Sequence, residues 1–140
     1  MNTTVILLLF ITAVLWGSTP IIEKIGLSRT DPLMGLTVRS IAVLVVLFVF
    51  LVASGRVKEV VNLDSKTILI FSVSGLMAGL LGMLTYFGAL KRGATSQIVP
   101  IAATYPLITA LLSVLILKEG VTFWRLLGTV FIVLGIWLVK

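Results

Sequence analysis

Two side chains of opposite charge, Glu23 and Arg39, stand within sequence that is otherwise largely apolar. To cross a bilayer, the second apolar stretch must begin near Leu33, which brings Arg39 to about four residues, or roughly 6 Å, from the midpoint. An arginine at that depth snorkels, pairs with an acid or faces a watery cavity. Glu23 is the predicted intrachain partner and Asp31 the second choice. The alternative is a tilted helix from which Arg39 merely reaches the headgroups.

Three further residues, Trp16, Thr104 and Tyr105, fall near the middle of apolar stretches. Tyr and Trp side chains normally prefer the membrane interfaces, where their polar groups stay hydrated. We therefore expect Trp16, Arg39, Thr104 and Tyr105 to line a substrate-binding pocket, with core packing around a satisfied hydroxyl as the alternative. In such a pocket Arg39 attracts an anionic or zwitterionic substrate, unless it only forms a lock with Glu23.

Composition excludes several kinds of chemistry. The 140 residues include no cysteine and no histidine, which removes disulfides, thiolate chemistry, most zinc and haem sites and every imidazole-dependent triad. No paired carboxylates lie within one apolar stretch, and no glycine-rich phosphate loop is present. We expect no enzymatic activity, no catalytic residue, no metal and no cofactor. The net charge is +6, and the lysines and arginines that produce it are scattered singly among short loops. This distribution indicates anchoring beside the membrane and no nucleic-acid partner.

Five apolar stretches of membrane-spanning length must position these residues. The mean hydropathy is +1.24 and 11% of residues are charged, against about 25% in a soluble domain. We predict an all-α membrane protein with a single domain over residues 1–140, built as a compact bundle of five transmembrane helices. The expected helices cover residues of about 5–25, 33–53, 67–90, 94–117 and 120–139. Such a chain is a multi-pass protein of the cell membrane, and an odd number of crossings places its termini on opposite sides.

Prolines are predicted to kink the first and fourth of these helices. A proline has no N–H, and its ring crowds the carbonyl four residues earlier. The prolines are Pro20, Pro100 and Pro106. Pro20 is expected to free the carbonyl of Trp16 near mid-bilayer, which is costly unless that group lines a cavity or bonds a hydroxyl. The hydroxyls within reach belong to Ser18 and Thr19.

Glycines form two stripes that would let another helix approach closely. They are Gly75, Gly79 and Gly82 in the third helix, and Gly128 and Gly135 in the fifth. We expect the fifth helix to form a contact between two copies of the chain, with the third helix as the alternative.

Lysines and arginines divide almost equally between the two sides of the predicted membrane topology. Five lie on one side (Arg56, Lys58, Lys66, Lys118 and Arg125) and six on the other (Lys24, Arg29, Arg39, Lys91, Arg92 and Lys140), which accounts for all 11. The positive-inside rule therefore gives no clear orientation. Either the chain inserts both ways and forms a dual-topology homodimer with an inverted copy, or a partner or an unusual membrane fixes one topology.

Several motifs resemble one family of membrane proteins. They are WGSTPIIEK from Trp16, the Asp31-Pro32 pair followed by Arg39, and the tail YPLITALLSVLILKEGVTFWRLLGTVFIVLGIWLV, with Gly128 and Gly135 seven residues apart. Together they look like an EamA-type domain of the drug/metabolite transporter superfamily. The resemblance covers essentially the whole chain. Typical members have ten helices in two inverted halves, and this chain resembles one such half.

The resemblance implies secondary transport of small metabolites or drugs through a cavity between two repeats, by alternating access. A single half would obtain its second repeat from an inverted copy of itself. Two alternatives remain open at the level of sequence: a flippase of lipid-linked intermediates or a subunit of one, and a membrane assembly partner without transport activity. Small multidrug transporters look related and carry a carboxylate inside their first helix. Glu23 lies toward the end of the corresponding helix here, which puts proton coupling through it in doubt.

Overall fold

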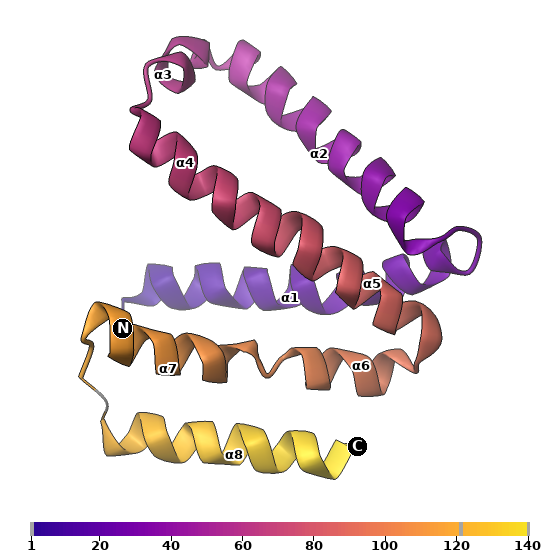
Figure 1. Ribbon diagram of the computed structural model, residues 1–140, viewed down its shortest axis with the longest axis vertical. Coiled ribbons are helices and arrows are strands. Elements are labelled where there is room, and N and C mark those ends of the chain that lie inside the picture. Colours follow the sequence, from indigo (N-terminus) through magenta and orange to yellow (C-terminus); the bar gives the residue numbers. More distant parts are fainter. Residues whose placement is uncertain (1, 121, 140) are drawn as a thin grey trace. The chain divides into compact units, whose positions relative to one another are not determined.

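The computed structural model describes residues 2–120 and 122–139, apart from the side chains of residues 125 and 139. The described backbone is helical and contains no strand, which confirms the predicted all-α class (Figure 1). The chain divides into two compact units, Met1–Lys91 and Arg92–Lys140.

The first unit contains two long helices followed by a third continuous helical segment, Ser65–Arg92, which we call the third rod. Its hydrogen bonding changes from α-helical to π-helical and back. The elements of the first unit are α1 (Thr3–Leu27), α2 (Pro32–Ala53), α3 (Val57–Val61), α4 (Ser65–Ser74), the π-helix η1 (Gly75–Gly82) and α5 (Met83–Arg92). The second unit contains α6 (Thr95–Ala102), α7 (Tyr105–Leu117) and α8 (Phe123–Val139).

Four helical segments of the described chain are long and apolar enough to cross a membrane. They are Thr3–Leu27, Pro32–Ala53, Ser65–Arg92 and Thr95–Leu117. The fifth predicted span, residues 120–139, corresponds to α8, whose 17 residues extend only about 26 Å. The bundle therefore has four strongly apolar segments and one shorter apolar helix.

Local sequence fixes where the long helices of the first unit begin. Asn2, Asp31 and Asp64 have extended backbones, and each side chain accepts a hydrogen bond from an N–H of the following first turn. Asp31 accepts from both Leu33 and Met34, and a proline follows it at the first helical position. This combination is a strong helix start, because the cap satisfies orphan donors and proline presets the backbone.

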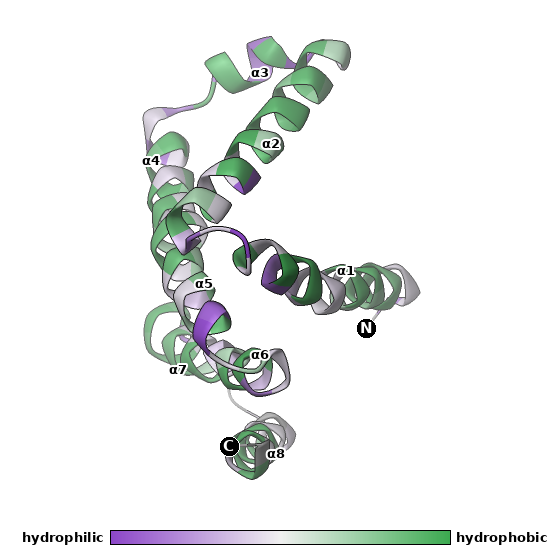
Figure 2. Ribbon diagram, turned by 90° about the vertical axis from the view of Figure 1, so that its right-hand side faces the viewer, coloured by the Kyte–Doolittle hydropathy of each residue, from purple (hydrophilic) through white to green (hydrophobic). Residues whose placement is uncertain are grey.

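The buried core of the first unit lies where α1, α2 and α5 meet. Leu27, Leu36, Phe87 and Leu90 are at most 2% exposed. Gly35 lies at this junction too, where a Cβ would make ordinary van der Waals contact with Leu27 at 3.5 Å and Phe87 at 3.8 Å. Away from this junction the helices are apolar over most of their length (Figure 2). Their large apolar side chains are exposed there, as expected for surfaces that meet lipid or other helices.

The glycine-rich centre of the third rod adopts a π-helix over eight residues. π-helical hydrogen bonds run five residues apart, and such segments are rare and often found at functional sites. This geometry favours glycine at position 82, because a Cβ there would lie 3.1 Å from the backbone carbonyl oxygen of Met77, closer than most Cβ contacts. The hydroxyl of Thr85 donates to the carbonyls of Leu81 and Gly82 at 3.0 and 2.9 Å, which supports the return to α-helix.

Replacing Gly82 with alanine should destabilise this segment, whereas Gly79→Ala is the matched control. A Cβ on Gly79 meets no atom within 4 Å, so the substitution should be neutral or stabilising by up to about 1 kcal/mol. We expect Gly82→Ala to be at least about 1 kcal/mol less stable than Gly79→Ala in detergent with one chain per micelle. The measurement is the free energy of unfolding by circular dichroism. Equal stability of the two variants would contradict the π-helical geometry.

Candidate functional site

A buried carboxylate faces an arginine at the junction of α1 and α2. The Arg39 Nε lies 3.7 Å from Glu23 Oε1, with side-chain exposures of 43% and 9%. Oε1 is buried and accepts no hydrogen bond from the described residues. The separation is longer than a hydrogen bond, so the two groups attract each other electrostatically but are not hydrogen-bonded. Burying a carboxylate this deeply is costly unless a cation or donor compensates, and Arg39 supplies the facing charge.

Asp31, the alternative partner of Arg39, has a different role. Its carboxylate oxygen accepts hydrogen bonds from the backbone N–H groups of Leu33 and Met34 at 2.9 and 3.1 Å. It therefore caps α2, which is the structural use of an Asp before Pro at a helix start. The structure places Glu23 closer to Arg39.

Two lysines tie the ends of α1 and α5 together. The ammonium of Lys24 donates to the carbonyls of Leu90 and Lys91 at 2.6 and 3.3 Å, and Lys91 donates to the carbonyl of Thr30 at 2.7 Å. The last carbonyls of a helix have no partner within the helix, and a cation there also complements the helix dipole. We call Lys24 and Lys91 the lysine clasp. Sequence analysis assigned both only to loop anchoring, although their places at helix ends were a signal for capping.

Around Trp16 the first helix runs unbroken through Pro20, which is buried. The hydroxyls of Ser18 and Thr19 both donate to the carbonyl of Leu15, at 3.0 and 2.7 Å, one residue before the carbonyl that proline was expected to free. The Trp16 side chain is 67% exposed within the chain. A role in a pocket wall stays a prediction.

The other two predicted pocket residues, Thr104 and Tyr105, belong to the second unit. The helix predicted over residues 94–117 is divided there, because α6 ends at Ala102 and α7 begins at Tyr105. Pro106 cannot donate to the carbonyl of Ala102, and the break falls at that missing hydrogen bond. The Thr104 hydroxyl instead donates to the carbonyl of Ile101 at 2.8 Å. Pro100 lies inside α6 without interrupting it.

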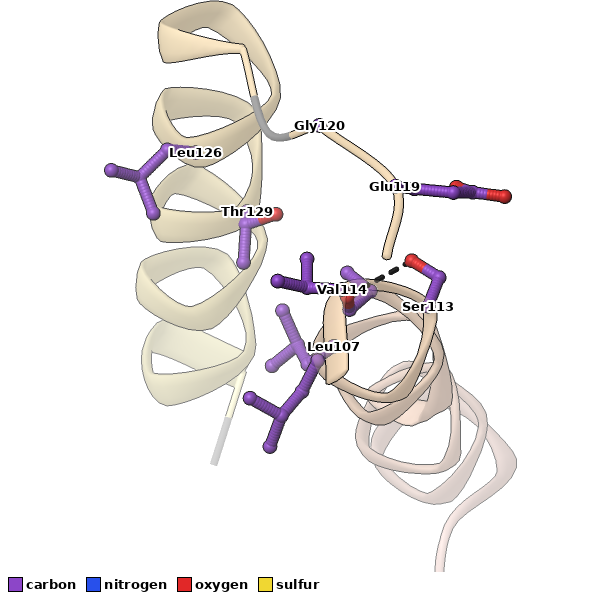
Figure 3. Close-up of a pocket in the computed structure, with 9 residues that line it drawn as sticks. Leu107, Ser113, Val114, Glu119, Gly120, Leu126 and Thr129 are labelled. Atoms are coloured by element: carbon purple, nitrogen blue, oxygen red, sulfur yellow. Dashed lines mark hydrogen bonds between the residues drawn. The ribbon is translucent and has the colours of Figure 1, made fainter. Parts of the chain in front are cut away.

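A cavity of about 340 Å³ lies within the second unit, between α7 and α8 (Figure 3). Leu107 and Val114 from α7 and Thr129 from α8 point into it, whereas Glu119 points away. Leu126 of α8 also lines the cavity. Ser113 lines the cavity too, but its hydroxyl is bonded to the carbonyl of Ala110 at 3.0 Å. None of the predicted pocket residues lines this cavity. Its apolar walls carried no distinctive sequence signal.

Four of the five glycines in the two predicted stripes have room for a side chain beside them. A Cβ at Gly75, Gly79, Gly128 or Gly135 would meet no atom within 4 Å, unlike one at Gly82. Within its own unit, none of these four glycines is in close contact with another helix, so their predicted use in helix packing stays a prediction.

Substituting Arg39 with glutamine removes the cation that faces the Glu23 carboxylate. We expect a loss of about 1 kcal/mol in the free energy of unfolding, less than for a fully buried pair because Arg39 is 43% exposed. Adding Glu23→Gln should restore part of the loss, since a neutral amide is less costly to bury. A double-mutant cycle in mixed micelles measures this coupling, and strictly additive effects would refute it.

Lys24→Met and Lys91→Met test the lysine clasp while retaining most of each apolar stem. Each substitution should cost about 1–2 kcal/mol, because carbonyls at a packed helix end lose a charged donor. Lys58→Met is the control, since Lys58 lies on exposed α3 and forms no ion pair with the described residues. If all three variants unfold at the same denaturant concentration, the clasp does not hold the junction.

Comparisons with known proteins agree with this architecture. The EamA-like transporter family matches over residues 3–140. An uncharacterized protein of Methanocaldococcus jannaschii is 30% identical over 133 residues, which are 95% of this chain and 93% of that protein. A Sinorhizobium protein named an uncharacterized transporter in the cobO 3′ region is 27% identical over 117 residues, or 84% of this chain and 82% of that one.

An uncharacterized transporter of Archaeoglobus fulgidus is 28% identical over 79 residues, which are 56% of this chain but only 28% of that protein. No solved structure is detectably similar. The family match and the apolar helices confirm the resemblance drawn from the motifs and the expected multi-pass placement in the cell membrane. The chain belongs to the EamA-like transporter family and carries a single EamA domain.

Proposed function

We propose that this chain is a secondary transporter of small metabolites or drugs that works by alternating access, with an inverted copy of itself supplying the second repeat. Transporters with inverted repeats place their substrate between the two repeats and open alternately to either side. The proposal assigns no bond-making chemistry to the chain. It takes support from the family and from the polar groups inside the spans.

The observation that carries the proposal is the Glu23–Arg39 pair. Ionisable groups within membrane helices are costly, and they commonly mark substrate or ion pathways. One member of this pair is nearly buried and the other is 43% exposed, with 3.7 Å between them. The two groups are not joined by a hydrogen bond, and the exposure of Arg39 leaves its guanidinium accessible to an anionic or zwitterionic substrate.

The proposal of an inverted copy is based on contacts that a single domain does not provide. Among the described residues, the fully buried apolar core is confined to the junction of α1, α2 and α5, and a Cβ on four of the five stripe glycines would meet no atom within 4 Å. Lysines and arginines divide five against six between the sides, so either orientation is accessible. Two curated relatives are close to this chain in length, since it covers 93% and 82% of them. We propose that the copies join through α8 or the third rod.

Within this dimer we propose that Trp16, Arg39, Thr104 and Tyr105 line the central cavity. Trp16 and Tyr105 are 67% and 55% exposed, which leaves their aromatic faces available to a solute. The helix break at Thr104 also provides a flexible point beside Tyr105.

Uptake into proteoliposomes, measured across a panel of anionic, zwitterionic and cationic metabolites, tests the proposal. Arg39→Ala should lower uptake of the preferred solute by about tenfold, the factor that corresponds to losing roughly 1.4 kcal/mol of binding. Arg29→Ala, in the exposed turn after α1, is the matched control and should transport normally. Circular dichroism verifies that each variant is folded.

Two results would contradict the proposal. Unchanged uptake by folded Arg39→Ala would remove Arg39 from the substrate path. Failure of the unaltered protein to move any solute in the panel would favour the assembly-partner alternative.

A further inference from the structure

The connection between α2 and α4 has a feature that the transport proposal does not use. It contains the short helix α3, Val57–Val61, at the membrane-boundary ends of two spans (Figure 1). Only residues 54–56 separate α3 from α2, and only residues 62–64 separate it from α4. Three extended residues reach about 10 Å at most, so α3 is held at the level of the lipid headgroups.

The turn that leads into α3 is built into the backbone. Gly55 has a φ of +70°, a conformation that side-chain-bearing residues rarely adopt. The N–H groups of Gly55 and Arg56 bond to the carbonyls of Val52 and Leu51 at 3.0 and 3.1 Å, which closes the end of α2. The chain therefore leaves the direction of α2 abruptly instead of continuing away from the membrane.

The five residues of α3 form an amphipathic turn. Val57, Val60 and Val61 are spaced three and four residues apart and share one face, whereas Lys58 and Glu59 project elsewhere. All three valines are exposed, Val61 by 75%. This face matches that of an interfacial helix, which dips apolar side chains below the headgroups and keeps its charges above.

Charges in this connection are arranged so that two lysines remain available. The Arg56 guanidinium bonds to Glu59 through Nε and Nη2 at 2.9 and 2.7 Å, and this hydrogen bonding holds the pKa of the Glu59 carboxyl below its usual value. Asp64 accepts from the hydroxyl and N–H of Thr67, and the hydroxyl contact is the main reason that its pKa is lowered. Both acids are therefore ionised and already engaged.

By contrast, Lys58 and Lys66 form no ion pair with the described residues. Lys66 also lies in the first turn of α4, where the helix dipole disfavours a cation. Both lysines are exposed at the membrane boundary, where such cations attract an anion from outside the chain. At headgroup level in a bilayer, that anion is a phospholipid headgroup.

We propose that α3, together with Lys58 and Lys66, is a docking surface for anionic phospholipids. The valine face enters the boundary of the acyl region, and the two lysines bind headgroup phosphates. A hollow of about 280 Å³, lined by Leu51, Arg56, Glu59, Val60 and Leu63, adjoins this surface and has room for part of one lipid. The surface anchors the adjoining ends of α2 and α4 to one leaflet.

The absence of cysteine in the chain allows single labels to test this docking. Val61→Cys lies at the last residue of α3, on the valine face, and Asn62→Cys lies at the C-cap that follows it; each would carry an environment-sensitive fluorophore. In vesicles with roughly one-third phosphatidylglycerol, a quencher attached to lipid chains should quench the label at 61 at least about threefold more than the label at 62. Vesicles of phosphatidylcholine alone should abolish most of that difference.

Lysine substitutions separate the anionic requirement from simple apolar contact. Lys58→Gln and Lys66→Gln should each weaken the phosphatidylglycerol-dependent quenching about fivefold at low salt, whereas Lys58→Arg with Lys66→Arg should preserve it. Transport and circular dichroism of the same samples distinguish this result from a failure of the proposed function or of folding.

Three outcomes would overturn the docking surface. Equal quenching at 61 and 62 would show that α3 does not lie on the bilayer. If quenching is the same with and without phosphatidylglycerol, and the same in the glutamine variants, no anionic lipid is bound. Release of the label from lipid by soluble glycerophosphate would assign the lysines to a free phosphate instead.

Discussion

The packed junction of α1, α2 and α5 is the interaction on which the rest of the first unit depends. Four apolar side chains are buried there, and the lysine clasp binds the carbonyls that the ends of α5 and the α1–α2 turn present. Backbone polar groups without partners are costly near lipid, so each lysine serves both packing and hydrogen bonding. The Glu23–Arg39 pair lies on the same two helices, α1 and α2, that this junction holds together.

The same junction explains why one domain presents so much apolar surface. Within each membrane-spanning window, at most 6% of the residues are buried inside the chain. Lipid tails can cover such surface, but lipid offers no complement to stripes of glycine or to a charged pair within a helix. In the proposed dimer a second copy would supply both complements, because its helices could approach the glycines and its pocket residues could face the first copy's polar pair.

Features that depend on residues close together in the sequence were easier to predict than features that depend on residues far apart in it. The start of the second helix was predicted near Leu33 from the length needed to cross a bilayer, and in the structure Asp31 and Pro32 fix that start through neighbouring residues alone. Glu23 and Arg39 stood out because charges are rare in apolar sequence, and the structure places them 3.7 Å apart. The family could be predicted from the motifs of the first and last segments.

Other features required information that no local pattern contains. Glycines in the third span indicated close packing against another helix, but not that Gly75–Gly82 would adopt π-helical hydrogen bonding. Two prolines indicated strain in residues 94–117, yet only Pro106 coincides with an interruption. The lysine clasp joins residues more than 60 positions apart, so its pairing depends on the fold of the whole unit. Convergence of Trp16 and Arg39 with Thr104 and Tyr105 stays a prediction for the same reason.

The central claim is that an oppositely oriented copy completes the transport path, and the number of labels carried by each dimer tests it most directly. Asn62→Cys, in the connection between two spans, is treated in sealed vesicles with a membrane-impermeant maleimide, quenched and extracted gently for native mass spectrometry. Inverted copies expose this residue on opposite sides, so each dimer should carry one label. Dimers with either two labels or none, or a chain that remains monomeric while transporting, would contradict the account.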